Sequence, residues 1–483
     1  MNLAGYAVAA GAGVVALIVL ARALLLRPEP AAAVDSPPRT GAGGVAEALA
    51  QAVRCATVSH QDPERFDPRP FAELRALFER SFPLLHAALK REIVSEHSLL
   101  FTWEGADPAL PPVLLMGHLD VVPVEGGTQD KWTHPPFSGA IADGFVWGRG
   151  TLDTKGSVVA ILAAVEGLLA QGFRPRRTVI LAFGHDEEVS GRRGAKAIAA
   201  LLASRGVKLA WVLDEGGAIL GPGAAPGVAA PVAAVGVAEK GYLTLRLTAT
   251  GKGGHAAMPP REAAPLKLAR ALRALERRPF PPRLQEPTLG FLRATAPYVP
   301  FPRRLALANL WLTRPLVAWT MARHPATAPY VRTTTAVTIL QAGTKENVVP
   351  QTASATVNLR LLPGETVDSA LARVRRVVGP DVAVEPPAPG WNPSPVSSPK
   401  GDGFTTLARA IRTCFPGVVV APSLVVGATD SRYYAPLAQA TLRFVPVVLT
   451  RDDLGRIHGT NERISVESLG KCVEFYTELL RSA

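Results

Sequence analysis

The feature that most constrains the fold is an alternation of short apolar runs and longer amphipathic segments. The apolar runs are 113–116, 178–183 and 209–213, and the segments between them, with apolar residues three and four apart, are 157–171 and 195–202. Apolar runs of this length predict buried strands, and the three-and-four spacing predicts helices. A strand–helix–strand–helix–strand order favours a doubly wound α/β fold around a mainly parallel sheet.

Acidic and histidine residues stand where these strands are predicted to end. Doubly wound sheets bind ligands just beyond the C-terminal ends of their strands. The residues at such positions are His118, Glu187, Glu188 and Asp214, and His458 lies far along the chain. Two imidazoles and several carboxylates from separate strand ends suit two divalent metal ions bridged by one carboxylate. The pattern therefore predicts a metal-dependent hydrolase.

Two aspartates lie in settings that suit such a site. His118 and Asp120 are two residues apart, so in an extended segment both side chains leave the backbone on the same side. A carboxylate so placed can fix the ring of a metal-bound histidine. Asp153 lies in a loop that opens a helix, after Gly148 and Gly150, where a carboxylate can bridge two ions roughly 3.5–4 Å apart. A helix N-cap is the alternative for Asp153.

Glu187 and Glu188 are adjacent and so point in different directions. One can bind metal while the other holds a water molecule, and a general base must be near the metal-bound water without being consumed by the metal. We interpret Glu187 as the base and Glu188 as the ligand. A solvated acidic turn is the alternative.

The pattern changes after residue 232. Strand-like segments follow at 232–237, 242–250, 333–340, 354–361 and 382–385, and helical ones at 262–276 and 367–378. This order predicts a smaller α+β domain inserted into the first, after which the chain returns to supply His458. The expected division is an N-terminal segment 1–27, a tether 28–44, a catalytic domain in two parts, 45–236 and 389–483, and an inserted lid domain 237–388.

Segment 280–330 fits this division poorly, because it is rich in Pro and Arg and carries Phe291, Phe301, Trp311 and Trp319. Four interpretations stay open for it. They are a helical cover over the active site, an extension of an acyl-chain pocket, a membrane contact, and an ordinary packed insertion.

The N-terminus carries a long apolar segment. No charged residue occurs from Leu3 to Ala21, and the run continues past Arg22. The length suffices to cross a bilayer, so we expect a membrane anchor; a cleaved signal peptide is the alternative and would make the protein secreted. Arg22 and Arg27 favour a cytoplasmic body, but so few charges leave the membrane side open.

Composition excludes some classes of function. The formal net charge is +12, yet no basic run is interleaved with aromatic residues and no nucleic-acid motif is present, so a nucleic-acid partner is not expected. Three cysteines in 483 residues do not form a disulfide framework, and no pair has metal-ligand spacing.

Five motifs, taken together, resemble one enzyme family. They are His118-Leu119-Asp120, the loop 148–155, Asp186-Glu187-Glu188, Leu213-Asp214-Glu215-Gly216 and His458-Gly459-Thr460-Asn461-Glu462. Their order is similar to that of the dinuclear zinc amidohydrolases, which include aminoacylases, carboxypeptidase S and bacterial glutamate carboxypeptidase. The resemblance covers roughly residues 45–480 and is nearest to the branch of carboxypeptidase S and the N-fatty-acyl-amino acid hydrolases.

The resemblance implies two zinc ions per subunit, with cobalt or manganese as alternatives. The implied ligands are His118 and Asp214 for one ion, Glu188 and His458 for the other, and Asp153 as the bridge. It also implies that Asp120 orients His118 and that Glu187 is the base. Members often carry a second Asp after the bridging residue, where this chain has Thr154.

The inserted domain resembles the family's lid. Its loop 251–259 matches a Gly/His loop whose histidine, here His255, approaches the scissile carbonyl oxygen, often from a partner subunit. A homodimer through the lid is therefore an open expectation. Substrate contacts are implied for Asn347, Arg360 and Arg432, the last in a loop that grips a free carboxylate with both arms of the guanidinium. A turn histidine and surface salt bridges are the alternatives.

The implied reaction is hydrolysis of an amide bond whose amine side carries a free α-carboxylate, in an N-acyl amino acid or a short peptide. Zinc would activate water, Glu187 would move its proton to the leaving amine, and His255 would stabilise the oxyanion. The apolar N-terminus and segment 280–330 favour long-chain N-acyl amino acids and leave the reverse condensation open. The alternatives are a narrow biosynthetic deacylase, a strict dipeptidase or carboxypeptidase, and a membrane-tethered binding protein without turnover.

Overall fold

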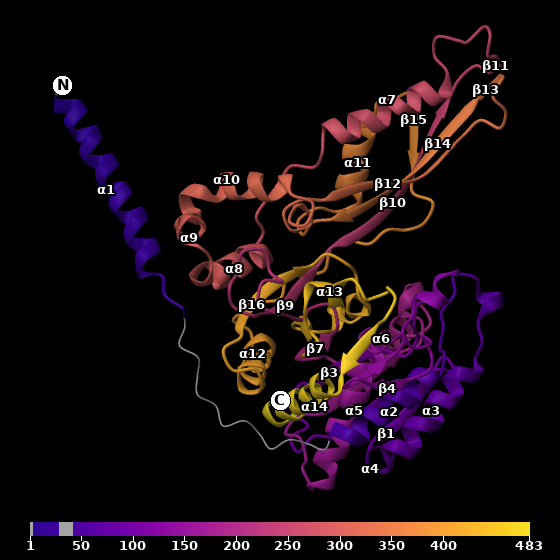
Figure 1. The fold of residues 1–483 in the computed structure, drawn as a ribbon, viewed down its shortest axis with the longest axis vertical. Coiled ribbons are helices and arrows are strands. Elements are labelled where there is room, and N and C mark those ends of the chain that lie inside the picture. The colour runs from indigo at the N-terminus through magenta and orange to yellow at the C-terminus, as the bar shows by residue number, and fades with distance from the viewer. Residues whose placement is uncertain (1–2, 29–41) are drawn as a thin grey trace.

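The computed structural model describes residues 3–28 and 42–483. Most of the predicted tether, 28–44, lies outside these residues. Figure 1 shows a large body low in the view, a smaller sheet at the upper right, and an N-terminal helix that extends to the upper left. A group of helices lies between that helix and the smaller sheet.

A ten-stranded sheet forms the large body. Its strands lie in the order β1 (Lys90–Val94), β2 (Ser98–Trp103), β6 (Val179–Gly184), β3 (Val113–His118), β7 (Trp211–Asp214), β17 (Thr441–Arg443), β9 (Val232–Glu239), β8 (Ile219–Leu220) and β18 (Val448–Leu449), and β16 (Val419–Val425) pairs with β9. The central pairs β6–β3, β3–β7 and β7–β17 are parallel, whereas β1–β2 and β2–β6 are antiparallel. The prediction of an α/β fold with a large, mainly parallel sheet is confirmed.

Both faces of this sheet are buried, which explains the unbroken apolar runs. Val113 and Leu115 of β3 face the larger core, and Leu114 and Met116 face a second one. The larger core includes α2 (Ala42–Arg54), α3 (Arg69–Ser81), α5 (Lys155–Ala170), α12 (Asp402–Cys414) and α14 (Val466–Ser482), and the second is covered by α6 (Ala195–Ser204). Successive side chains of a strand point to opposite faces, so a strand covered on both sides needs apolar residues throughout.

A small three-stranded sheet brings the two ends of the catalytic body together. It comprises β4 (Ala140–Ala142), β5 (Phe145–Trp147) and β19 (Arg463–Ser465). Arg463 of β19 pairs with Trp147 of β5. The loop before β19, which carries His458, therefore lies beside the loop after β5, which carries Asp153.

The inserted region forms its own antiparallel sheet. The strand order is β12 (Thr334–Ala342), β14 (Thr352–Leu361), β10 (Gly241–Thr250) and β15 (Val382–Glu385), and α7 (Ala264–Arg277) and α11 (Val367–Val378) share its core. In β10, buried and outward residues alternate along the strand, as a sheet covered on one face requires. The short strands β11 (Gly254–His255) and β13 (Val348–Val349) pair at the far tip (Figure 1).

Segment 280–330 is helical. Its main helices are α8 (Glu286–Thr295), α9 (Phe301–Ala308) and α10 (Leu310–Arg323). Residues Phe291 and Val299 pack with Val232 of β9 and Ala421 of β16. The first part of the segment is thus an ordinary packed insertion, whereas Trp311 and Trp319 of α10 are exposed.

The N-terminal segment forms α1 (Leu3–Leu25). Among the residues that the structure describes, no helix combines the length and apolarity needed to cross a bilayer, so the expected membrane span is not supported. Whether the segment anchors the chain or is cleaved stays a prediction. Cys55, Cys414 and Cys472 are buried free thiols.

Candidate dinuclear metal centre

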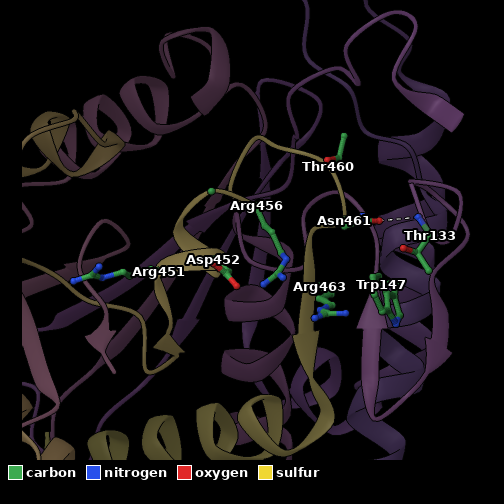
Figure 2. Close-up of a pocket in the computed structure, with 9 residues that line it drawn as sticks. Thr133, Trp147, Arg451, Asp452, Arg456, Thr460, Asn461 and Arg463 are labelled. Carbon is green, nitrogen blue, oxygen red and sulfur yellow. Dashed lines mark hydrogen bonds between the residues drawn. The ribbon is translucent and has the colours of Figure 1, made fainter. Parts of the chain in front are cut away.

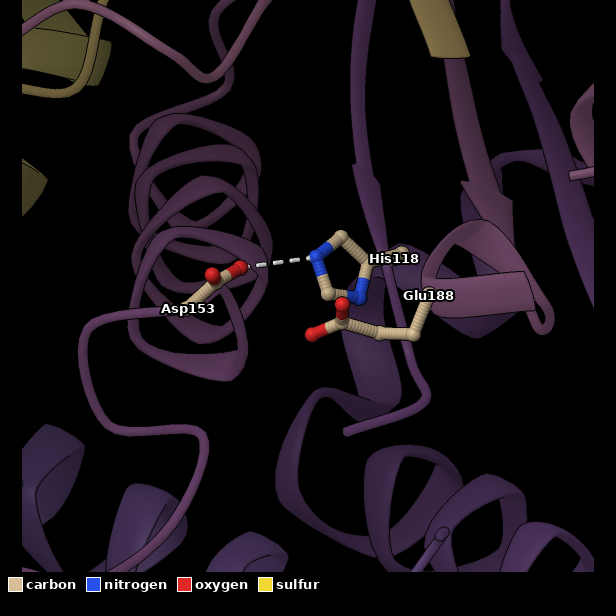
Figure 3. A group of neighbouring side chains, drawn as sticks. All are labelled: His118, Asp153 and Glu188. Atoms are coloured by element: carbon tan, nitrogen blue, oxygen red, sulfur yellow. Dashed lines mark hydrogen bonds and ion pairs between the residues drawn. The ribbon is translucent and has the colours of Figure 1, made fainter. Parts of the chain in front are cut away.

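Asp153 joins the two histidines that the sequence singled out. Its Oδ1 lies 2.9 Å from Nε2 of His118, and its Oδ2 lies 2.9 Å from Nε2 of His458. Figure 3 shows the first of these contacts, with the carboxylate of Glu188 beside the His118 ring. One oxygen directed at each imidazole is the arrangement that a carboxylate bridging two ions requires.

Two groups of potential ligand atoms meet at His118. One contains His118, Asp153 and Glu188, the other contains His118, Glu187 and Glu215, and within each group the atoms lie within 4.8 Å of one another. Glu188 Oε1 lies 3.3 Å from His458 Nε2, and Glu215 Oε1 lies 3.3 Å from His118 Nε2. The structure thus brings together His118, Asp153, Glu187, Glu188 and His458, as the sequence predicts.

Asp214 lies outside both groups, unlike its predicted position. Its Oδ2 accepts a hydrogen bond from the backbone N–H of Ser431 (2.8 Å), and its Oδ1 accepts one from the N–H of Glu215 (2.9 Å). Asp214 is the last residue of β7, and its carboxylate turns to the neighbouring 429–431 loop. The next side chain, Glu215, faces His118 instead. The sequence analysis predicted Asp214, the last residue of the strand, as the ligand. Glu215 is the next residue of the same motif.

The tautomer of His118 is set by the backbone. Its Nδ1 lies 2.9 Å from the carbonyl oxygen of Asp120, which can only accept, so Nδ1 carries the proton. Nε2 then presents its lone pair to the cluster in the neutral ring. The Asp120 carboxylate lies farther off, with Oδ1 3.3 Å from Nδ1.

The carboxylate of Asp120 lies beside that ring, as predicted, and also makes contacts that the sequence did not indicate. It accepts hydrogen bonds from the backbone N–H groups of Glu187 and Glu188, both at 3.1 Å, and from the hydroxyl of Ser59 at 2.5 Å. Glu187 and Glu188 begin the short helix η3 (Glu187–Val189) after β6. Asp120 therefore fixes the turn that presents both glutamates. Ser59 was missed because nothing in the local sequence marks it.

Burial and crowding of acids shift the ionisation of this cluster. Burial, with the nearby Asp430 carboxylate, raises the pKa of Glu187 well above its ordinary value. Burial and Asp153 raise the pKa of Glu215 to about 8. Hydrogen bonds to Asp153 and Glu188 raise the pKa of His458 to about 10. The crowded carboxylates therefore favour the protonated forms of these three groups. Divalent cations bound at the same place would balance that negative charge instead.

The donor set fits divalent cations. Glu188 Oε1 is buried and lies 3.3 Å from His458 Nε2, so it is placed to share a cation with that ring. Burial by itself would lower the pKa of His118, but Glu215, Asp120 and Asp153 raise it well above its ordinary value. Two imidazoles among several carboxylates, without a thiolate, suit zinc, cobalt or manganese. The identity of the ion stays a prediction.

Glu462 organises the loops that carry Asp153 and His458. Its buried Oε1 accepts hydrogen bonds from the backbone N–H groups of Gly150 (3.0 Å), Leu152 (2.9 Å) and Asp153 (3.2 Å). Its Oε2 accepts one from Arg149 at 2.7 Å, and Arg149 also donates to the carbonyl oxygen of His458 at 3.1 Å. The residue lies in a motif quoted above, but its role could not be inferred without these contacts.

A pocket lies beside the segment that follows His458 and is lined in part by Thr133 and Asn461 (Figure 2). Asn461 accepts a hydrogen bond there from the N–H of Thr133 at 2.7 Å. His458 and Asn461 both adopt positive φ angles, of 60° and 59°. A left-handed backbone conformation is costly for most residues and tolerable for Asn. The hydrogen bond from Thr133 to Asn461 therefore helps to hold the turn that presents His458.

The predicted lid residues His255 and Asn347 lie at the far tip of the lid, away from the metal cluster of the same chain (Figure 1). Both are exposed, and the carbonyl oxygen of Asn347 accepts a hydrogen bond from Ala256 at 3.0 Å. Nδ1 of His255 accepts from the N–H of Ala257 at 3.1 Å. Nε2 therefore carries the ring proton and is free to donate.

The two arginines predicted to bind substrate contact aromatic rings, and one of them also donates hydrogen bonds to backbone carbonyl oxygens. Arg432 donates to the carbonyl oxygens of Thr429 (2.7 Å) and Ser190 (2.8 Å), so it ties its loop to the end of η3. Its guanidinium also stacks on Trp391, 4.8 Å from the ring centroid. Arg360 lies on β14, 4.9 Å from the ring centroid of Tyr242. Contact of either arginine with substrate stays a prediction.

A family model described as peptidase family M20/M25/M40 matches residues 114–482. Probable carboxypeptidase S-like 2 of Dictyostelium discoideum is 41% identical over 446 residues, 91% of this chain and 85% of that protein. The human N-fatty-acyl-amino acid synthase/hydrolase PM20D1 is 41% identical over 443 residues, 90% of this chain and 87% of that protein.

Solved structures share the fold at lower identity. The M20 family metallo-carboxypeptidase Sso-CP2 from Sulfolobus solfataricus aligns with a TM-score of 0.65 at 16% identity, covering 90% of this chain and 98% of that one. Human carnosine dipeptidase 1 aligns with a TM-score of 0.61 at 16% identity, covering 91% and 96%. At these identities the likeness shows the fold alone.

Proposed function

This chain belongs to peptidase family M20/M25/M40, and from that premise we propose that it hydrolyses the amide bond of N-acyl amino acids with long acyl chains. The observation that carries the proposal is the Asp153 carboxylate, with one oxygen 2.9 Å from each of His118 and His458. The 41% identity to a human N-fatty-acyl-amino acid synthase/hydrolase supports the acyl preference.

In this proposal the chain's own residues would hold two divalent ions, zinc before cobalt or manganese. Asp153 would bridge them, His118 and Glu215 would hold one, and Glu188 and His458 would hold the other. Glu215 takes the place first assigned to Asp214, because its carboxylate is the one near His118. When bound, the ions supply polarisation of the scissile carbonyl and acidification of a water molecule.

Glu187 acts as the general base. Its carboxylate belongs to the group that contains His118 and Glu215, so it lies near the reacting centre. Burial raises the pKa of its carboxyl above the ordinary value, which makes the carboxylate a stronger base. Glu187 takes the proton from water and returns it to the leaving amine. Asp120 keeps Glu187 in place through its bond to the Glu187 N–H.

Arg432 and Arg360 are the proposed partners of the substrate's carboxylate. Both guanidiniums rest against aromatic rings, Trp391 and Tyr242, which themselves stack 4.6 Å apart. A pair of arginines on one aromatic stack offers a fixed positive surface to a carboxylate. Asn347 is proposed to contact the substrate from the lid.

The oxyanion donor is proposed to come from a second copy of the chain. His255 and Asn347 lie at the lid tip, away from the metal cluster of their own chain. The free Nε2–H of His255 can donate to a developing oxyanion. A homodimer through the lid would supply that donor.

The direct test compares substrates and a base variant. We expect purified, zinc-loaded enzyme to hydrolyse N-oleoyl amino acids, and Glu187→Gln to keep its metal while losing about 10²–10⁴-fold in kcat. Glu276→Gln, on the exposed face of α7, is the matched control and should retain full activity.

Three results would overturn parts of the proposal. Cleavage of dipeptides alone would identify a strict dipeptidase. Failure to cleave any amide while two metals are bound would identify a binding protein without turnover. Full activity of Glu187→Gln would show that another group is the base.

A further inference from the structure

We propose that α1, α9 and α10 together form a surface that docks on an anionic lipid bilayer, separately from the reaction. We call it the α1–α10 surface and define it by residues 10–28 and 301–323. Large apolar side chains on it stand in solvent, among them Leu17, Leu24, Phe301, Trp311, Leu316 and Trp319. Trp311 is 58% exposed and Trp319 is 49% exposed. Apolar patches of this extent mark interaction sites.

The three helices form one surface through direct contacts. Arg22 donates from Nε to the carbonyl oxygen of Ala308 at the end of α9 (3.1 Å). Asn309 donates from Nδ2 to the carbonyl oxygen of Val19 in α1 (2.9 Å), and Ala23 is fully buried. Figure 1 shows this group on the side of the molecule away from α14 and the lid tip. The exposed apolar residues of α1 therefore continue onto α9 and α10.

The charge of the surface identifies its partner. Residues 3–28 and 287–345 contain no Asp or Glu, whereas Arg22, Arg27, Arg303, Arg314 and Arg323 are exposed. Helices that combine basic residues with Trp, Phe and Leu lie in the interface of membranes, where anionic lipids attract them. The Arg323 guanidinium lies 3.6 Å from the Trp319 ring centroid, so charge and aromatic ring act at one point.

An acid-free surface favours a bilayer over a second copy of this chain. A two-fold contact would place these arginines against one another without carboxylates to pair them. Anionic head groups would neutralise them instead, while the tryptophans enter the level of the head groups.

Tryptophan fluorescence tests this surface specifically, because α1 contains no Trp. Full-length protein is reconstituted into phosphatidylglycerol vesicles whose acyl chains carry bromine, which quenches nearby indoles. We expect quenching in the wild type and its loss in W311F/W319F. Trp103, Trp132, Trp147 and Trp211 are buried, and Trp391 lies in the stack with Tyr242. Equal quenching in the variant, or none in the wild type, would overturn the proposal.

A charge variant separates lipid docking from apolar association. R303E/R323E keeps both tryptophans, and we expect at least about a tenfold loss of anionic-vesicle binding by the α1–α10 surface, read as lost quenching. Hydrolysis of a water-soluble N-acetyl amino acid or dipeptide should stay as in the wild type and shows that the variant is folded. Unchanged quenching contradicts the proposal. The proposal is also contradicted if the wild type sediments as a dimer in detergent and W311S/W319S sediments as a monomer. That result would assign the surface to contact with a second copy of the chain.

Discussion

The metal centre and the lid tip differ in how their functional side chains are held. At the metal centre the side chains are held by buried carboxylates: Asp120 binds two backbone N–H groups and Glu462 binds three. At the lid tip His255 and Asn347 are exposed on a two-stranded turn. The centre is assembled within one chain, whereas the tip presents its groups outward.

Rigid support matters more at the metal centre than at the lid tip. Metal ligands must be held against the mutual repulsion of several acids, which a network of buried hydrogen bonds provides. An oxyanion donor on an outward-facing tip can serve another copy of the chain.

Replacing the bridge should remove activity altogether. Asp153→Asn keeps the shape of the side chain but loses the charge that two ions share, so we expect metal content to fall and hydrolysis to drop below detection. Elemental analysis and an amidase assay measure both. Asp381→Asn, at an exposed position, is the control. A variant that stays active with two ions bound would break the assignment of Asp153.

Removing the lid histidine should impair catalysis without disturbing the metals. We expect His255→Ala to lose about 10²–10³-fold in kcat, as loss of one oxyanion donor does, with unchanged metal content. If His255 comes from the partner copy, mixing H255A with E187Q restores about a quarter of wild-type activity, because half of the dimers are mixed and each has one complete site. No recovery on mixing would place the donor within one chain.

Glu462→Gln should destabilise the catalytic body. The variant leaves Arg149 buried without its ion pair, so we expect the free energy of unfolding to fall by about 3–5 kcal/mol. Urea denaturation of the metal-free protein measures this. Glu262→Gln removes the exposed partner of Arg270, and such surface pairs contribute at most about 1 kcal/mol. Equal losses in the two variants would contradict the role given to Glu462.

The smallest expected effect is on the pH dependence of the metal-free protein. The pKa of Glu215 is raised to about 8 and that of His458 to about 10, so their protonated forms are stabilised in the folded state. This contribution is fully present at low pH and is lost as pH rises through 8 and then 10. With a chelator present, Tm should fall between pH 6 and 10, and added zinc should reverse the trend. A flat Tm without metal would show that the shifts are absent.

Sequence reasoning located the sheet and most of the centre for a physical reason. Strands buried on both faces are apolar throughout, so their ends are marked by the first polar residues, as at His118 and Glu187. The first polar residue locates the end of a strand to within about one position. A shift of one position changes the direction in which the side chain points. Asp214 and Glu215 differ by that single step.

Other features depend on contacts between distant segments and leave no local signal. Ser59 bonds Asp120, and Glu462 bonds the 150–153 backbone, across 61 and about 310 positions of the chain. The exposure of Trp311 and Trp319 likewise depends on how α10 packs, so the sequence left four interpretations of that segment open.

Asp153 is proposed to bridge two metal ions. A crystal of the zinc-loaded enzyme, measured at the zinc absorption edge, would show whether both ions are bound there. We predict two anomalous peaks per chain, each about 2.0–2.2 Å from a different oxygen of Asp153, with His118 and Glu215 on one ion and Glu188 and His458 on the other. A single peak, or an ion bound by Asp214 in place of Glu215, would contradict the proposed metal centre.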